Sequence, residues 1–248
     1  MQIHLTELKV EARQAIRGRH PSAFLVSLAF YLILVLLTLL SRRLMITTMH
    51  FEEIIALSEQ MAAAQTQAQQ MRILESLAAL SDTRERLGEY MILAIDLMET
   101  MLMMGFAKYC LDLSRGIDGT VWSLFDAFGN FFRFLGLNIL ISILVSLATL
   151  LLIIPGIILS YSYALAPYLL MDDPKKGPIQ CMRESRERMR GHKWKLFLLD
   201  LSLLGWLLLT LIPGVAIYTV PYCYTVRANF YRAVTGRWEA PEHVDIIV

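Results

Sequence analysis

Charged residues are scarce in this chain of 248 residues, because only 18% are Asp, Glu, Lys or Arg whereas 56% are apolar. Soluble globular chains have about 25% charged and about 45–50% apolar residues. The apolar residues are collected in long runs, and residues 22–41 contain no charged side chain at all. These features exclude an ordinary soluble domain, a disordered chain and a fibrous repeat.

Cysteine is also scarce, and neither charge sign is in large excess. Cys110, Cys181 and Cys223 are far apart and form no C-x-x-C pair, so neither a disulfide framework nor a zinc site is predicted. The net charge of +1 provides no field that would attract nucleic acid. The chain has no phosphate-binding loop, dinucleotide fingerprint, zinc-protease motif or nucleophile elbow. We therefore expect no metal, no cofactor and no nucleic-acid partner, and we assign no catalytic residue.

What the chain does have is a set of apolar segments of the length that crosses a bilayer, which is about 20 helical residues. The predicted spans are residues 22–41, 90–110, 134–155, 156–171, 195–212 and 213–231. The third and fourth spans, and the fifth and sixth, each meet at an Ile-Pro-Gly sequence in the middle of an apolar run. Proline interrupts a helix and glycine permits a reversed backbone, so residues 134–171 and 195–231 are each predicted to form a transmembrane hairpin.

A repeated pattern precedes the first, third and fifth spans, where a short amphipathic stretch leads to a glycine and a base. The three glycines are Gly18, Gly129 and Gly191. This pattern favours three units, each with an interfacial helix, an outward span and a return span; the alternative is that basic segments beside a membrane simply look alike. Residues 1–21 and 115–133 are the predicted interfacial helices, with their apolar faces in the headgroup layer.

The first unit contains an insertion at residues 44–89, in which apolar residues recur every three or four positions. That spacing predicts a helix or helical hairpin outside the membrane. Residues 172–195 contain eight Lys or Arg, whereas residues 44–89 contain three of these bases and seven acids. Because basic loops stay in the cytoplasm, we expect the segment 172–195, both termini and the tail 232–248 to be cytoplasmic, with the insertion outside.

Three stretches are distinctive: the sequence G-F-A-K-Y-C-L-D-L-S-R-G at 105–116, I-I-P-G-I-I at 153–158, and M-R-G-H-K-W at 189–194 followed by Phe197 and Gly205-Trp206. Together they resemble the DUF975 family of bacterial integral membrane proteins. The resemblance extends over nearly the whole chain and is weakest in residues 44–89. It implies a multi-pass protein of the bacterial plasma membrane, in a family whose function is uncharacterised.

Acidic and amide side chains inside the predicted spans are the first candidate site. Asp96 and Glu99 share one face of the second span, where ionisable groups are costly and are often functional. The alternative is that the second span begins later and both acids lie in the outer headgroup layer. Asn138 and Asp200 lie at similar depths in the third and fifth spans and are expected to hydrogen-bond between helices; Asp200 could instead pair with Lys195 or Lys108.

A second candidate is the basic segment before the fifth span. It contains Arg183, Arg186, Arg190, His192, Lys193 and Lys195. These bases could contact anionic lipid headgroups or phosphate-bearing ligands, or could serve only to set the topology.

The sequence thus predicts an all-α membrane protein with six transmembrane helices in three hairpin units, interfacial helices and an extracytoplasmic helical insertion. The leading hypothesis is a non-enzymatic protein that binds lipid, a small amphipathic ligand or a partner protein in its bundle, as a transporter, channel or accessory subunit. Membrane lipids are its expected partners, and a protein partner or a second copy of the chain are further candidates. An intramembrane enzyme that acts on lipid and a scaffold that shapes the membrane are the alternatives.

Overall fold

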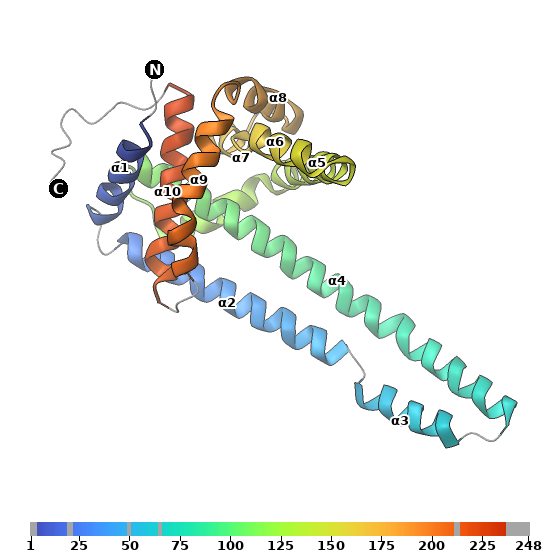
Figure 1. Ribbon diagram of the computed structural model, residues 1–248. Helices are drawn as coiled ribbons and strands as arrows, with labels where there is room; N and C mark the ends of the chain where they lie inside the picture. The colour runs from blue at the N-terminus through green and yellow to red at the C-terminus, as the bar shows by residue number, and fades with distance from the viewer. Residues whose placement is uncertain (1–3, 19–21, 49–50, 64–65, 211–213, 237–248) are drawn as a thin grey trace. The chain divides into compact units, whose positions relative to one another are not determined.

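The computed structural model describes residues 4–18, 22–48, 51–63, 66–210 and 214–236. All regular elements in these ranges are helices (Figure 1). They are α1 (Leu5–Arg17), α2 (Ser22–Thr48), α3 (Phe51–Ala63), α4 (Gln67–Ser114), the 3-10 helix η1 (Val121–Asn130), α5 (Phe131–Leu151), α6 (Ile153–Tyr163), α7 (Ala166–Asp172), α8 (Pro178–Arg188), α9 (Lys193–Leu209) and α10 (Ala216–Val234). The predicted all-α class is therefore confirmed for the described residues.

The chain divides into two compact units, which we describe separately. The smaller unit is Leu32–Thr100, and the larger unit combines Met1–Tyr31 with Met101–Val248. The smaller unit contains α3 and most of α2 and α4. Helix α4 continues without a break from the predicted insertion into the predicted second span, because nothing in its sequence removes a backbone donor or ends the helix.

Four helical segments in the described ranges are long and apolar enough to cross a membrane. They are Ala23–Met45, Gly88–Ser114, Val121–Leu151 and Ile153–Asp172. These segments overlap the first four spans expected from the sequence. Helices α9 and α10 occupy the positions of the fifth and sixth expected spans, but neither belongs to this group of four. Most of the second Ile-Pro-Gly sequence lies outside the described residues.

The joint between α5 and α6 differs in detail from the sequence-based expectation. The helix is interrupted at Leu152, whose backbone is extended, so that Pro155 lies in the first turn of α6, where no helical hydrogen bond is lost. The expected reversed backbone at Gly156 is wrong, because this glycine does not have a positive φ. Gly156 instead permits close approach of the two helices: a Cβ there would lie 2.1 Å from the Thr149 hydroxyl oxygen and 2.9 Å from the Thr149 Cα.

Helix α1 is amphipathic as expected, but protein covers its apolar face. Leu8, Ala12 and Ile16 are buried, and α1 packs against α10. Two polar contacts hold the pair together: the Asn229 side chain donates to the Leu8 carbonyl oxygen, and Arg232 donates to Glu11. The expectation that this face lies in the lipid headgroup layer is therefore replaced by helix-on-helix packing.

The segment 115–133 is less helical than expected. Residues 117–120 are irregular, η1 has the tighter 3-10 geometry, and α5 begins only at Phe131. Leu124 and Ala127 are buried, whereas the side chains of Trp122 and Phe132 are 78% and 84% exposed. The larger unit therefore presents aromatic rings at its surface beside the start of α5.

Candidate functional site

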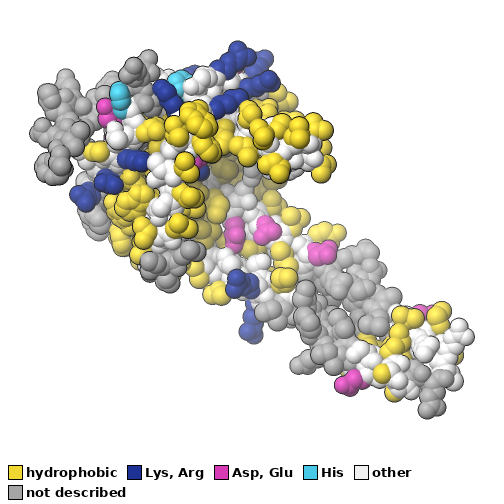
Figure 2. Space-filling view, viewed as in Figure 1, with side chains coloured by type: hydrophobic (Ala, Val, Ile, Leu, Met, Phe, Trp, Pro, Cys, Tyr) yellow, Lys and Arg dark blue, Asp and Glu magenta, His cyan; other side chains and the backbone are white. Residues whose placement is uncertain are grey.

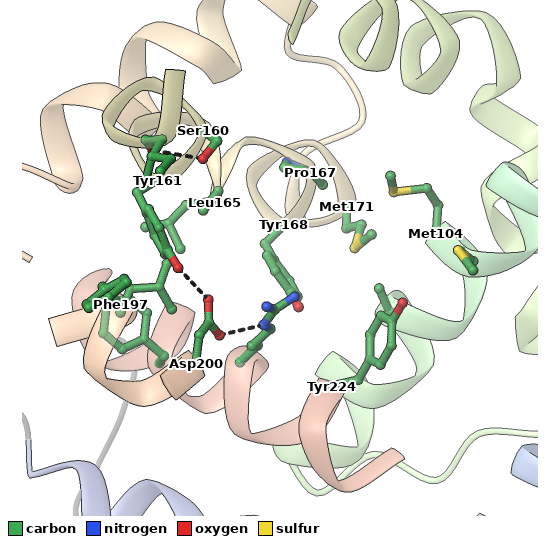
Figure 3. Close-up of a pocket in the computed structure, with 17 residues that line it drawn as sticks. Met104, Ser160, Tyr161, Leu165, Pro167, Tyr168, Met171, Phe197, Asp200 and Tyr224 are labelled. Carbon is green, nitrogen blue, oxygen red and sulfur yellow. Dashed lines mark hydrogen bonds and ion pairs between the residues drawn. The ribbon is translucent and has the colours of Figure 1, made fainter. Parts of the chain in front are cut away.

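The larger unit contains a partly open cavity of about 680 Å³ among the end of α4, α6, α7, α9 and α10 (Figure 3). Its walls are mostly apolar and include Met104, Ile157, Leu165, Pro167, Met171 and Phe197. Its polar lining comprises Ser160, Tyr161, Tyr168, Asp200, Tyr224 and Arg227. An apolar cavity of about 300–1,000 Å³ with a few convergent polar groups is typical of small-molecule sites.

A break between α6 and α7 shapes one wall of this cavity. Pro167 lies in the first turn of α7 and has no N–H for a continuous helix. The buried Ser185 on α8 stabilises the break, because its hydroxyl donates to the Ser162 carbonyl oxygen at 2.9 Å and accepts from the Leu165 N–H at 3.2 Å. These contacts satisfy backbone groups that the interruption would otherwise leave unpaired.

An ion pair between neighbouring helices forms the polar end of the cavity (Figure 3). Asp200 on α9 accepts from Nε of Arg227 on α10 at 3.0 Å, and from the Tyr161 hydroxyl on α6 at 3.3 Å. Asp200 thus bonds to two other helices, but its partners are neither Lys195 nor Lys108. Lys108 pairs with Asp126 at 2.7 Å instead.

A second polar network lies next to Tyr168, one of the residues that line the cavity. The Tyr168 ring is stacked on Tyr231 with 5.3 Å between the ring centroids. The Tyr231 hydroxyl donates to Asp172, which also forms an ion pair with Arg115 at the end of α4. This chain of contacts fixes α7 against α10 and α4, and it therefore fixes the ring of Tyr168 in the cavity wall.

The remaining polar candidates do not line this cavity. In the smaller unit, Glu99 on α4 accepts from the Thr38 hydroxyl on α2 at 3.3 Å, and Asp96 is exposed on the same helix. In the larger unit, Asn138 is half-buried on α5. Of the four polar residues chosen from the sequence, only Asp200 belongs to the cavity lining.

The basic candidates lie on α8, in the turn that follows it and at the start of α9, where Figure 2 shows Lys and Arg side chains gathered at one end of the larger unit. Arg183, Arg186 and Arg190 are exposed, whereas His192, Lys193 and Lys195 are half-buried. Burial, followed by repulsion from Lys195, lowers the pKa of His192. This histidine is therefore held toward its neutral form, and the positive charge of the surface comes from the Arg and Lys side chains.

A carboxylate on α8 partly neutralises this surface. Glu184 forms ion pairs with Lys176 and Arg188, each at 2.8 Å. Burial raises the pKa of Glu184, but the hydrogen bonds from Lys176 and Arg188 outweigh it and the pKa lies below its ordinary value. Glu184 is thus ionised and organises Lys176 and Arg188, while Arg183, Arg186 and Arg190 are exposed at the surface.

Sequence reasoning missed Arg227, the basic partner of Asp200. A signal was present, because Arg227 is an ionisable residue within the predicted span 213–231, and such residues are functional candidates by the rule applied to Asp96 and Glu99. Which acid Arg227 meets depends on how α9 and α10 pack. Over the described part of the chain, no group of three His, Cys, Asp or Glu residues could hold a metal ion.

The apolar helices, four of them able to cross a bilayer, indicate a membrane protein. Residues 143–238 match the model of a family described as "Protein of unknown function (DUF975)". The match includes α6 to α10, and with them every cavity residue except those of α4. The chain matches no curated protein and no solved structure.

Proposed function

We propose that this protein is a multi-pass protein of the bacterial plasma membrane that binds a small amphipathic molecule, such as a lipid, in the cavity of its larger unit. The observation that carries the proposal is the cavity itself, with apolar walls and a single ion pair at its polar end. Such a site offers burial to a hydrocarbon chain and hydrogen bonds to a polar head. Transfer of an alkyl chain from water into such a cavity gains about 0.8 kcal/mol per buried methylene, so the apolar walls favour a ligand with a hydrocarbon chain over a small polar solute.

The proposal favours binding over catalysis. The enzyme hypothesis relied on Asp96 and Glu99 as an acid and a base, and neither residue lines the cavity. Asp200 does line it, but both of its oxygens already accept hydrogen bonds. The role that fits these residues is recognition of a ligand, as in a transporter or an accessory subunit of a transporter.

Filling the cavity is expected to weaken ligand binding. Ala164 lines the cavity, and Ala164→Phe places a ring where about two methylenes of a bound chain would lie. We expect about tenfold weaker binding from that loss. The measurement is photolabelling in nanodiscs with a neutral alkyl alcohol that carries a diazirine, followed by mapping of the labelled peptides.

The matched control is Ala94→Phe, which adds the same ring at an exposed position of α4 in the smaller unit. It should leave labelling of the α6, α7 and α10 peptides unchanged. Equal labelling of those peptides in Ala164→Phe and in the unmodified protein would contradict the proposed binding site.

The proposed orientation places both termini and the basic segment 172–195 in the cytoplasm, and α3 outside. Support comes from the exposure of Arg183, Arg186 and Arg190, because exposed bases beside a span are retained on the cytoplasmic side. The three natural cysteines are buried, so single cysteines at exposed positions can report the orientation.

We expect Gln60→Cys on α3 to react with a membrane-impermeant maleimide in intact spheroplasts, and Arg190→Cys to react only after permeabilisation. Both positions are exposed, and the natural cysteines are replaced by serine in both variants. Labelling in permeabilised cells is the control for reactivity. Reaction of Arg190→Cys in intact spheroplasts would contradict the orientation.

A further inference from the structure

The hydrogen-bonding capacity left open at the polar end of the cavity is that of a donor. Asp200 is largely covered and both of its oxygens accept hydrogen bonds, one from Arg227 Nε and one from the Tyr161 hydroxyl. The Arg227 side chain is 51% exposed, compared with 20% for Asp200. Among the contacts of the described residues, the two terminal nitrogens of Arg227 have no protein acceptor.

The surroundings of Arg227 allow a ligand to approach those terminal nitrogens. Figure 3 shows Tyr161 pointing toward Asp200, whereas Tyr168 and Tyr224 lie on the opposite side of Asp200 from Tyr161. Their hydroxyl groups can both donate and accept hydrogen bonds. Two tyrosines and a guanidinium group thus line the same part of the cavity, next to the apolar side chains of Met104 and Met171.

We propose that the ligand bound in this cavity carries an anionic oxygen headgroup, a carboxylate or a phosphoryl group, which Arg227 binds through its terminal nitrogens. This inference rests on the proposed function and adds the chemistry of the ligand's head. A guanidinium group presents paired N–H donors that match two oxygens of a carboxylate or phosphate. Asp200 and Tyr161 are then positioning residues. Asp200 accepts from Nε of Arg227 and so directs the two terminal nitrogens into the cavity, and Tyr161 donates to Asp200.

The charge of the site explains why head and chain are both required. Asp200 balances the charge of Arg227, so the empty ion pair is neutral overall and attracts a free anion only weakly. An anion that also brings a hydrocarbon chain gains burial against the apolar walls. An alcohol with the same chain gains the burial, but its single neutral oxygen cannot accept the paired hydrogen bonds that a guanidinium group donates to a carboxylate or phosphate.

The test is competition against the diazirine-labelled alkyl alcohol in nanodiscs, with dodecyl phosphate, dodecanol and inorganic phosphate as competitors. We expect dodecyl phosphate to compete at a concentration about tenfold lower than dodecanol, and inorganic phosphate not to compete. Arg227→Gln should remove the difference between dodecyl phosphate and dodecanol. Lys175→Gln is the matched control, because it removes one positive charge from an exposed position before α8 and should preserve the difference.

The outcomes separate the headgroup inference from the proposed function. Equal competition by dodecyl phosphate and dodecanol in the unmodified protein overturns the headgroup inference and leaves the apolar cavity in place. Failure of both to compete overturns both proposals. Competition by inorganic phosphate as strong as that by dodecyl phosphate overturns the amphipathic ligand in favour of a small anion.

A folding defect in Arg227→Gln would appear as loss of labelling by the neutral probe itself. Arg227→Lys then decides the question, because it retains the charge but not the paired donors of a guanidinium group. We expect dodecyl phosphate to compete at a concentration about threefold lower than dodecanol in this variant. A full preference for dodecyl phosphate in this variant overturns the role of the paired donors.

Discussion

Gly105→Ala is expected to destabilise the larger unit by about 3 kcal/mol. Gly105 lies on α4 where the backbone of η1 crosses it, and a Cβ at this position would lie 1.8 Å from the carbonyl oxygen of Leu124 and 2.6 Å from its carbonyl carbon. Both are backbone atoms, so no side chain can rotate out of the way. Overpacking of this kind costs about 1–3 kcal/mol and occasionally more, and Leu124 is itself fully buried.

The matched control for this prediction is Gly205→Ala on α9. An added Cβ at Gly205 meets nothing within 4 Å, so alanine should only improve helix propensity, by about 0.5–1 kcal/mol. Denaturant titration in detergent micelles, followed by circular dichroism, measures both variants. Similar unfolding midpoints for Gly105→Ala and Gly205→Ala would show that α4 and η1 are not in close contact.

This pair of glycines illustrates what the sequence could and could not reveal. Gly105 lies in the second span expected from the sequence, but its chain neighbours do not indicate which backbone it meets. That backbone belongs to η1, a segment expected from its aromatic residues to lie in the lipid headgroup layer. Hydropathy predicts which segments are helical and apolar, because it depends on local composition. Close approach of two helices depends on atoms from distant positions and is not encoded in any local pattern.

The same reasoning applies to the cavity. Asp200 could be chosen from the sequence because an acid in an apolar run is conspicuous. Its partner could not, since the sequence alone suggested Lys195 or Lys108 and did not indicate which helices pack beside Asp200. The packing of α6, α9 and α10 selects Arg227 and adds Tyr161 as a second donor. Loop charge and hydropathy therefore located one residue of the site, and three-dimensional packing supplied the others.

Helix α1 was the other element whose environment could not be predicted. Its apolar stripe is compatible with lipid or with protein, and the stripe alone does not distinguish them. The structure covers it with α10 and places a polar cluster at the contact: Arg232 in the last turn of α10 donates to Glu11, to the Ser114 carbonyl oxygen and to the Asn229 side chain. The end of α4 is thus connected to both α1 and α10 through a single guanidinium group.

Arg232→Gln is therefore expected to destabilise the larger unit by about 2–3 kcal/mol. The Arg232 side chain is 13% exposed and that of Glu11 is 18% exposed, so water replaces the lost contacts poorly. Hydrogen bonds to charged groups contribute about 1.5–3 kcal/mol, and removing one partner of a covered ion pair also leaves the other incompletely compensated. Arg186→Gln on the exposed face of α8 is the matched control and should change stability by less than about 0.5 kcal/mol.

A double-mutant cycle with Glu11→Gln separates the ion pair from the other contacts of Arg232. If the pair joins α1 to α10, the two single substitutions should be non-additive, with a coupling free energy of about 1–2 kcal/mol in denaturant titrations. Limited proteolysis gives an independent measurement, because both single variants should be cleaved faster between α1 and α2 than Arg186→Gln. Strictly additive effects, with cleavage rates equal to that of Arg186→Gln, would mean that the ion pair between Glu11 and Arg232 does not hold α1 to α10.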